Sequence, residues 1–280
     1  MKIPVIFFGA SQFVLPLIAL LQKNYDLTLV VTTEKNPQDT VPAFCKNNHI
    51  PFVPVTSLKE LKALYPKFVS LHCPVALLAD FGVIVPQSLI DIFPKGIVNI
   101  HPSLLPKYRG PTPGQTALLL GDTTTGVSLM LLDKEVDHGP ILAQEKAYIA
   151  TTDTAESLYK KLFAAGTKLL ENVLPAYLSG KLQPTLQNHT KATFTKALSR
   201  DAGFIDSSKP IAKGLLHRMI RAYYPWPGVW TTVQLNNKQV RMKLLPEDLV
   251  QIEGKKPMSH KDFMNGYTEG KAILEKLQLK

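Results

Sequence analysis

Short apolar runs of strand length alternate with helix-like stretches through the first half of the 280-residue chain. The apolar runs, rich in Val, Ile, Leu and Phe, occupy residues 5–8, 27–32, 69–71, 75–78 and 97–100. The candidate helices among them occupy residues 13–22, 41–48 and 57–64. Because this alternation is typical of βαβ units, we predict an α/β domain with a mostly parallel sheet. Ligands of such sheets gather beyond the carboxyl ends of the strands, so the loop after residue 100 is the first place to search for a site.

Two more strands and a long helix extend this domain. Residues 126–132 and 140–149 are the predicted strands, on either side of a polar loop. Asp153 is the predicted N-cap of the helix, with Glu156 reaching back to it. The helix is expected to end at Ser179-Gly180-Lys181. Its apolar stripe, the pattern of a helix with one buried face, consists of Leu158, Leu162, Ala165, Leu169 and Val173.

The rest of the chain indicates a linker and a small second domain. We predict a first domain over residues 1–182, a polar linker over residues 183–200 and a C-terminal domain over residues 201–280. The elements expected in the C-terminal domain are a helix around residues 211–223, a corner of Pro and Trp at residues 225–228, and strands at residues 229–234 and 239–244.

The net charge of +10 is concentrated in the C-terminal part. Residues 1–180 contain 15 Lys and Arg against 14 Asp and Glu, whereas residues 181–280 contain 17 against 8. A basic domain appended to a neutral one is the charge distribution expected of a protein that binds a polyanion. A basic surface that only contacts solvent is the alternative.

Composition excludes several classes of protein. Hydrophobic residues make up 45% and charged residues 19%, which is typical of a soluble globular protein. No apolar run approaches the roughly 20 residues of a membrane helix, and the apolar start reads as a buried strand rather than a signal peptide. We therefore expect a cytoplasmic protein. Cys45 and Cys73 are too few for a zinc site, so we expect inert thiols and no bound metal.

Asn99 and His101 stand at the end of the last predicted parallel strand. Alternate residues of a strand point to the same face, so these two side chains lie together. A proline-rich loop follows them directly. A lone histidine is more often structural, but an Asn-x-His pair at the exit of a buried strand favours a site.

Asp133 and Asp137 lie in a second loop, which ends at Gly139-Pro140. A solvated turn is the plain alternative for this loop. Taken with Asn99 and His101, however, Asp137 completes a set of groups suited to acyl transfer. An amide can donate to an oxyanion, an imidazole can move protons near neutral pH, and a carboxylate can orient the imidazole or accept a proton. Because no serine or cysteine nucleophile stands beside a base, we expect direct attack by an amine of the substrate.

The segment from Asn99 to Pro106, together with Asp133-x-x-x-Asp137-x-Gly139, resembles the paired signature of the 10-formyltetrahydrofolate-dependent formyltransferases. The resemblance covers residues 1 to about 180. It implies a Rossmann-like sheet, 10-formyltetrahydrofolate as the formyl donor and no metal. Asn99, His101 and Asp137 correspond to the catalytic trio of the family. The residues that the resemblance implies for donor binding are Phe81, Gly82, Val83, Ile84, Ser103, Leu104, Leu105, Pro106 and Asp133.

The C-terminal domain bears on the identity of the amine. Segments 198–206, 220–228 and 254–259 resemble the appended domain of methionyl-tRNA formyltransferases. This resemblance implies initiator methionyl-tRNA as the partner, an abbreviated OB-like β-barrel, and neither a membrane nor an obligate protein partner. The residues expected to bind the acceptor are Phe13, Arg109, Lys196, Arg200, Arg218 and Arg221.

Two features of the sequence differ from those of related enzymes: the loop at residues 33–40 and the residue at position 111. The tRNA enzymes of the family usually have a long basic loop where residues 33–40 form a short one with a single basic residue, Lys35. Pro111 stands where nucleotide-sugar relatives often place an arginine, which disfavours a sugar acceptor. An amino-sugar formyltransferase and a non-catalytic RNA- or folate-binding protein remain the alternatives.

Overall fold

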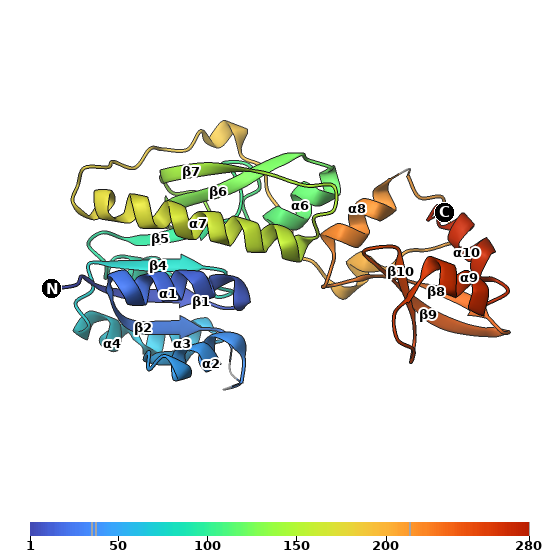
Figure 1. Ribbon diagram of the computed structural model, residues 1–280. Helices are drawn as coiled ribbons and strands as arrows, with labels where there is room; N and C mark the ends of the chain where they lie inside the picture. Colours follow the sequence, from blue (N-terminus) through green and yellow to red (C-terminus); the bar gives the residue numbers. More distant parts are fainter. Residues whose placement is uncertain (35, 37, 213, 280) are drawn as a thin grey trace. The chain divides into compact units, whose positions relative to one another are not determined.

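A computed structural model of the chain describes residues 1–34, 36, 38–212 and 214–279 (Figure 1). Lys35, the basic residue of the predicted short loop, and Pro37 lie outside the described residues. The chain forms two compact units. The first consists of Met1–Gly110, Thr125–Tyr148 and Tyr159–Phe194, and the second of Pro111–Thr124, Ile149–Leu158 and Thr195–Lys280.

The first unit contains a seven-stranded sheet in the order β3-β2-β1-β4-β5-β6-β7. The pairs among β1 to β5 are parallel, and β5 pairs with β6 in antiparallel fashion. The predicted α/β fold with a mostly parallel sheet is therefore confirmed. The strands are β1 (Pro4–Gly9), β2 (Asp26–Thr32), β3 (Phe52–Pro54), β4 (Val75–Ala79), β5 (Ile97–His101), β6 (Thr124–Leu131) and β7 (Ile141–Tyr148).

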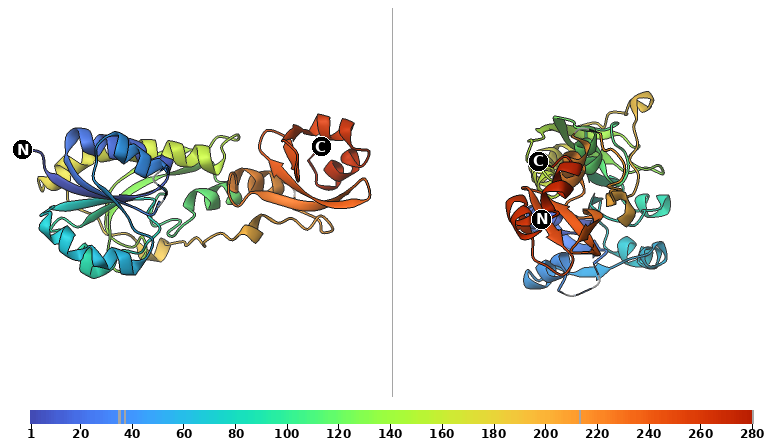
Figure 2. Two further views of the ribbon diagram at one scale, coloured as in Figure 1. Left: turned by 90° about the horizontal axis from the view of Figure 1, so that it is seen from below. Right: turned by 90° about the vertical axis from the view of Figure 1, so that its right-hand side faces the viewer.

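Helices cover both faces of this sheet, as Figure 2 shows. In β1, Val5 and Phe7 belong to one hydrophobic cluster, while the alternating Ile6 and Phe8 belong to the other. The first cluster packs under α1 (Leu15–Asn24), α2 (Thr40–Asn47) and α7 (Ala155–Leu178), and a short 3₁₀ turn, η1 (Gln12–Val14), leads into α1. The second packs under α3 (Leu58–Ala63), α4 (Tyr65–Ser70) and α5 (Gln87–Ile90).

The strand predicted at residues 69–71 is wrong, because Val69 and Ser70 form the last turn of α4 and Leu71 is its C-cap. Pro66 sits in the first turn of that helix, where its missing N–H costs nothing. Phe68 is fully buried, whereas Val69 is 46% exposed. Three neighbouring apolar letters are too few to distinguish a short strand from a helical turn.

The N-cap predicted for α7 is shifted by one residue. The backbone N–H of Ser157 donates to Thr154 Oγ1 at 3.2 Å, and the N–H of Thr154 donates to Ser157 Oγ at 3.0 Å. This reciprocal pair takes the place of the expected Asp153 and Glu156. Asp153 instead accepts hydrogen bonds from the Ala150 N–H and the Ser157 hydroxyl, which ties the preceding turn to the helix.

The second unit contains a four-stranded antiparallel sheet in the order β11-β10-β9-β8. The small β-domain expected for this part of the chain is confirmed, in the form of this sheet. Asn236 and Asn237, both with positive φ, make the two-residue turn between β8 and β9. Helix α9 contacts β10 and β11, and α8 contacts α6 and β9. The elements are α6 (Pro113–Leu120), η2 (His189–Lys191) of the first unit, η3 (Arg200–Gly203), α8 (Leu215–Ala222), β8 (Val229–Leu235), β9 (Lys238–Leu245), β10 (Leu249–Ile252), β11 (Met258–Ser259), α9 (His260–Gly266) and α10 (Gly270–Lys276). None of the helices in the described ranges has the length and hydrophobicity needed to span a membrane.

Both cysteines are expected to resist a water-soluble maleimide in the native protein at neutral pH. Cys45 and Cys73 are free thiols, 0% and 3% exposed. Burial, with the nearby Glu34 carboxylate, raises the pKa of Cys45 to about 11, and burial also raises the pKa of Cys73. Because the thiolate is the reactive form, labelling should reach both residues only after denaturation. Mass spectrometry checks this, and rapid labelling of the native protein would contradict the buried positions.

Candidate active site

The last parallel strand, β5, brings Asn99 and His101 to one face of the sheet. Val98 and Ile100 alternate with them and pack into the cluster under α7. The two polar side chains therefore point to the opposite face. Asn99 is 6% and His101 5% exposed. Buried polar side chains need partners, and theirs come from the loop between β6 and β7.

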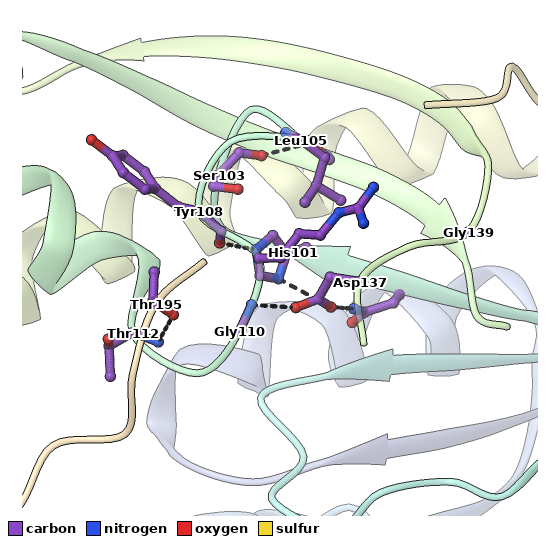
Figure 3. Close-up of polar contacts among 12 residues, drawn as sticks. His101, Ser103, Leu105, Tyr108, Gly110, Thr112, Asp137, Gly139 and Thr195 are labelled. Atoms are coloured by element: carbon purple, nitrogen blue, oxygen red, sulfur yellow. Dashed lines mark hydrogen bonds and ion pairs between the residues drawn. The ribbon is translucent and has the colours of Figure 1, made fainter. Parts of the chain in front are cut away.

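That partner is Asp137, whose carboxylate joins both residues. Asp137 Oδ1 accepts a hydrogen bond from Asn99 Nδ2 at 3.3 Å and lies 3.5 Å from His101 Nδ1. The other oxygen, Oδ2, accepts a hydrogen bond from the backbone N–H of Gly110 at 2.8 Å. Figure 3 shows the contacts of Asp137 with His101 and Gly110. The structure thus brings together the three side chains that the sequence singled out.

The second ring nitrogen of His101 fixes the tautomer. His101 Nε2 lies 3.0 Å from the backbone oxygen of Tyr108. A carbonyl oxygen only accepts hydrogen bonds, so Nε2 carries the proton in the neutral ring. Nδ1, which faces Asp137, is then the nitrogen that gains and loses a proton. The arrangement lets the carboxylate stabilise an imidazolium ion.

The loop after β5 is largely buried and held by its own contacts. Ser103 Oγ donates to the Lys107 oxygen at 2.6 Å, and the Leu105 N–H donates to Ser128 Oγ at 3.0 Å. Ser103 and Leu105 are 0% and 3% exposed. Of the residues expected to bind the donor, these two therefore face the interior of the loop. Their burial and these hydrogen bonds hold the loop in shape next to His101.

Other residues of the loop after β5 also pack internally. The Leu104 side chain lies against Gly126, where a Cβ would fall 2.5 Å from Leu104 Cδ2. The Pro106 oxygen accepts a hydrogen bond from the Thr193 N–H at 3.2 Å. Leu104 and Pro106 are both half-buried. These contacts hold the loop in place beside His101.

The loop after β4 offers a more open apolar surface. Phe81 packs edge-on against Phe8, with ring centroids 5.5 Å apart, and Val83 packs against the same cluster. Ile84 is 75% exposed. A Cβ added at Gly82 would meet nothing within 4 Å, so space does not require glycine there. Phe81 and Val83 are half-buried against the core, whereas the Ile84 side chain is exposed.

Asp133, also expected to bind the donor, has partners within its own loop. Its Oδ1 accepts a hydrogen bond from the Glu135 N–H at 2.9 Å, and its Oδ2 lies 2.6 Å from His138 Nδ1. The His138 ring in turn stacks on His189, with centroids 3.9 Å apart. These contacts give the loop between β6 and β7 a defined shape.

Two of the residues expected to bind the acceptor lie in the first unit and are committed to packing. The Phe13 ring is stacked with that of Phe163, at a centroid distance of 6.1 Å, and also contacts Tyr159. Arg109 is only 3% exposed, and its Nη2 donates to Gln187 Oε1 at 2.7 Å. A guanidinium so deeply buried holds neighbouring loops together instead of presenting charge to solvent.

The other four expected acceptor residues lie in the second unit. Lys196 and Arg200 are exposed cations. Arg218 Nε donates to the Leu119 oxygen at 2.8 Å, and Arg221 Nη1 donates to the Asp153 oxygen at 3.1 Å. Burial lowers the pKa of Arg221. Arg218 and Arg221 thus use part of their hydrogen-bonding capacity on the backbone of their own unit.

Three residues that contact His101 or Asp137 could not be recognised from the sequence: Tyr108 faces His101, and Gly110 and Gln187 bond to Asp137. Tyr108 and Gly110 act through backbone atoms, which carry no sequence signal. Gln187 stands in the segment predicted as a linker, yet it is 6% exposed. Its Nε2 contacts lie 48 and 50 residues away along the chain, so no local pattern could have revealed it.

Two open hollows lie elsewhere on the first unit. Both include Met1, Lys2 and Tyr25, at the amino ends of β1 and β2. Asn99 and His101 stand at the carboxyl end of β5, the opposite end of the parallel sheet, so the hollows are separate from the trio. Among the residues that the structure describes, no three His, Cys, Asp or Glu side chains are grouped to hold a metal ion.

Comparison with known proteins decides the family. The model of the formyl transferase family matches residues 1–174. The chain belongs to this family. The predicted enzyme class is therefore confirmed, and the acyl-transfer groups on β5 and its neighbouring loop belong to a formyltransferase.

Individual relatives and solved structures are also similar to the chain. The chain is 38% identical over 242 residues to the methionyl-tRNA formyltransferase of Chloroflexus aurantiacus, covering 81% of this chain and 75% of that protein. The structure of phosphoribosylglycinamide formyltransferase from Bacillus halodurans is 26% identical, with a TM-score of 0.56 over 64% of this chain and 96% of that one. An N-formyltransferase from Helicobacter canadensis, in complex with folinic acid and dTDP-3-aminofucose, has a TM-score of 0.66 at 20% identity over 89% of this chain and 95% of that one, and shares the fold.

Proposed function

We propose that this formyltransferase moves a formyl group from 10-formyltetrahydrofolate to the amino group of initiator methionyl-tRNA. The observation that carries the chemistry is the single carboxylate oxygen of Asp137, which lies beside both Asn99 Nδ2 and His101 Nδ1. The acceptor is supported by relatives named methionyl-tRNA formyltransferase, which are 33% to 39% identical to the chain.

In this reaction the formyl donor is a substrate that is consumed. The neutral amine attacks the formyl carbon, a carbon–nitrogen bond forms, and the carbonyl electron pair moves to oxygen. Asn99 has two N–H donors, and the bond to Asp137 uses one of them. The second is available to donate to the oxyanion, and protonated His101 adds positive charge beside it. Preorganised donors of this kind stabilise the negative charge as it develops.

Proton transfer completes the exchange. The attacking nitrogen loses a proton to Asp137, directly or through a water molecule. The bond between the formyl carbon and the folate nitrogen then breaks and the carbonyl re-forms. The folate nitrogen takes up the proton that Asp137 received, directly or through a water molecule, and Asp137 returns to the carboxylate. Asp137 is suited to this role because it is held by Asn99, His101 and Gly110 at the same time. A fixed carboxylate needs little reorganisation when the proton moves.

The loops around the trio carry apolar side chains that could contact a folate ring. Ile84, after β4, and Val136, in the loop that bears Asp137, are both exposed apolar side chains. Folate-sized ligands bind mostly to apolar walls with a few polar groups that set their orientation. We propose that these two loops enclose the pterin ring, with Phe81, Val83 and the backbone around Gly82 behind them.

The last hundred residues of the chain supply the charge for a nucleic-acid partner. Residues 181–280 hold 17 basic against 8 acidic residues, and Lys196 and Arg200 are exposed. Contacts from Lys and Arg to phosphate dominate the affinity of such partners. We propose that residues 1–182 catalyse formyl transfer, that residues 201–280 bind tRNA, and that the protein acts in the cytoplasm, where initiator tRNA is used.

A panel of amines tests the acceptor. With 10-formyltetrahydrofolate, the protein is expected to formylate charged initiator methionyl-tRNA and to leave free methionine and a nucleotide amino sugar unchanged. Each product is identified by mass, and reactions without the donor are the control. Formylation of the amino sugar without formylation of the tRNA would overturn the acceptor while keeping the chemistry. No formylated product from any amine would overturn both.

A further inference from the structure

We propose that Gln187 is a positioning residue that holds Asp137 in its working orientation. This inference rests on the proposed role of Asp137 in formyl transfer. Gln187 comes from the segment between α7 and the second unit, which the sequence suggests is a plain linker. Its side chain instead reaches into the loop between β6 and β7, where it contacts the backbone of Asp137 itself.

Every hydrogen-bonding position of the Gln187 amide is occupied. Its Nε2 donates to the backbone oxygens of Asp137 at 2.9 Å and of Gly139 at 2.7 Å. Its Oε1 accepts from Arg109 Nε at 3.2 Å and from Arg109 Nη2 at 2.7 Å. An amide offers two N–H donors and two oxygen lone pairs. The four contacts therefore leave one orientation for this side chain.

The backbone of Asp137 needs such support. Its φ is 50°, in the left-handed region that residues with a side chain rarely adopt. A strained residue persists only where its surroundings over-determine it. The direction of the Asp137 carboxylate follows from this backbone conformation. A hydrogen bond to the carbonyl of the same residue therefore also controls where the carboxylate points.

Arg109 connects the residue that bonds to the Asp137 backbone, Gln187, with the residue that bonds to the Asp137 carboxylate, Gly110. It is bound by Gln187 through its guanidinium, and it directly precedes Gly110, whose N–H donates to Asp137 Oδ2. Gln187, Arg109, Gly110 and Asp137 thus form a closed ring of contacts around the carboxylate. Arg109 Nη2 also lies 2.8 Å from His189 Nδ1. Because a guanidinium only donates, Nδ1 of His189 is the acceptor of this hydrogen bond.

The segment that carries Gln187 is anchored on both sides. Before it, Thr185 and Ile141 exchange two backbone hydrogen bonds, each of 2.8 Å. After it, the Arg109 N–H donates to the Thr193 oxygen at 2.9 Å, and the Tyr108 N–H donates to Thr193 Oγ1 at 2.8 Å. Gln187 is therefore delivered to the Asp137 loop by a segment bonded to β7 on one side and to the loop after β5 on the other.

The test is the substitution Gln187→Glu. It preserves size and the contact with Arg109, but it places an oxygen where the amide N–H groups meet the carbonyls of Asp137 and Gly139. We expect kcat for formyl transfer to fall about tenfold or more, with the KM for the acceptor changed less than about threefold. Gln183→Glu is the matched control, because Gln183 is an exposed glutamine of the same segment, bonded to the Gly180 oxygen. Its kcat should stay within about twofold of the wild type.

A double-mutant cycle distinguishes positioning from general support of the fold. Residues that act through one another show non-additive effects. In an Asp137→Asn background, Gln187→Glu should lower kcat by less than about threefold, because the group it positions is already impaired. If Gln187→Glu fails to fold, as judged by circular dichroism and thermal unfolding, Gln187→Met enters the same cycle. Equal losses in both backgrounds, or no loss in the wild-type background, would overturn the inference. A wild-type protein without formyl transfer would instead overturn the proposed function.

Discussion

Replacing His101 by alanine is expected to lower kcat for formyl transfer by on the order of a hundredfold or more while the fold survives. The substitution removes the imidazole whose Nδ1 lies 3.5 Å from Asp137 Oδ1. It thereby deletes the positive charge proposed to stabilise the oxyanion. It also leaves the Tyr108 oxygen without the ring N–H that it faces at 3.0 Å. Single-turnover kinetics with saturating donor and acceptor measure the effect on the chemical step.

The control for His101→Ala is His72→Asn. His72 is an exposed histidine just after α4, and asparagine tolerates its φ of 49°. This variant should turn over at the wild-type rate, and the thermal unfolding of both variants shows whether the fold is retained. A His101→Ala enzyme with nearly wild-type kcat would refute the role of the imidazole.

Asp137→Asn is the second substitution with a large expected effect, again a fall in kcat on the order of a hundredfold or more. The carboxylate now accepts hydrogen bonds from Asn99 and Gly110 and faces His101 Nδ1. An amide in its place must point an N–H group at one of these donors, whichever way it turns. It also lacks the negative charge that stabilises an imidazolium ion and receives the amine proton.

The same kinetic assay with Asp91→Asn controls for the loss of a carboxylate. Asp91 is exposed at the C-terminal end of α5, where its Oδ1 accepts a hydrogen bond from Gln87. We expect no change in kcat for this variant. If Asp137→Asn retained activity close to that of Asp91→Asn, proton removal and orientation of His101 would have to come from another group.

Local patterns explain why much of the fold could be predicted. The strands β1, β2, β4 and β5 are predominantly apolar, because helices cover both faces of a parallel sheet and exclude water from most of its residues. Asn99 and His101 were visible because they interrupt such a run with the period of a strand. The short segments were harder. Apolar residues such as Val69 and Leu71 occur both in helical turns and in strands, so three of them do not determine the element. The N-cap of α7 could be placed only to within one residue.

The site could be predicted only in part, because its supports are not local. The loop that carries Asp137 can be recognised in the sequence. The groups that hold Asp137, however, are the backbone N–H of Gly110 and the side-chain amide of Gln187. Backbone donors have no residue preference to detect. Gln187 lies in a polar stretch whose composition is that of a linker, and its burial arises from contacts with Arg109, 78 residues away. Tertiary structure alone brings these groups together.

The register in which β5 pairs with its neighbouring strands determines whether the catalytic side chains face the site. Val98 and Ile100 are packed beneath α7, where Gly166 leaves so little room that an added Cβ would fall 2.7 Å from Ile100 Cγ2. A shift of one residue in the pairing of this strand would place Asn99 and His101 in the apolar layer beneath α7. It would also turn the Val98 and Ile100 side chains toward Asp137. Such a molecule would lose stability and turnover together. Formyl transfer is therefore a direct readout of correctly paired protein, and a misregistered but soluble and active population is not expected.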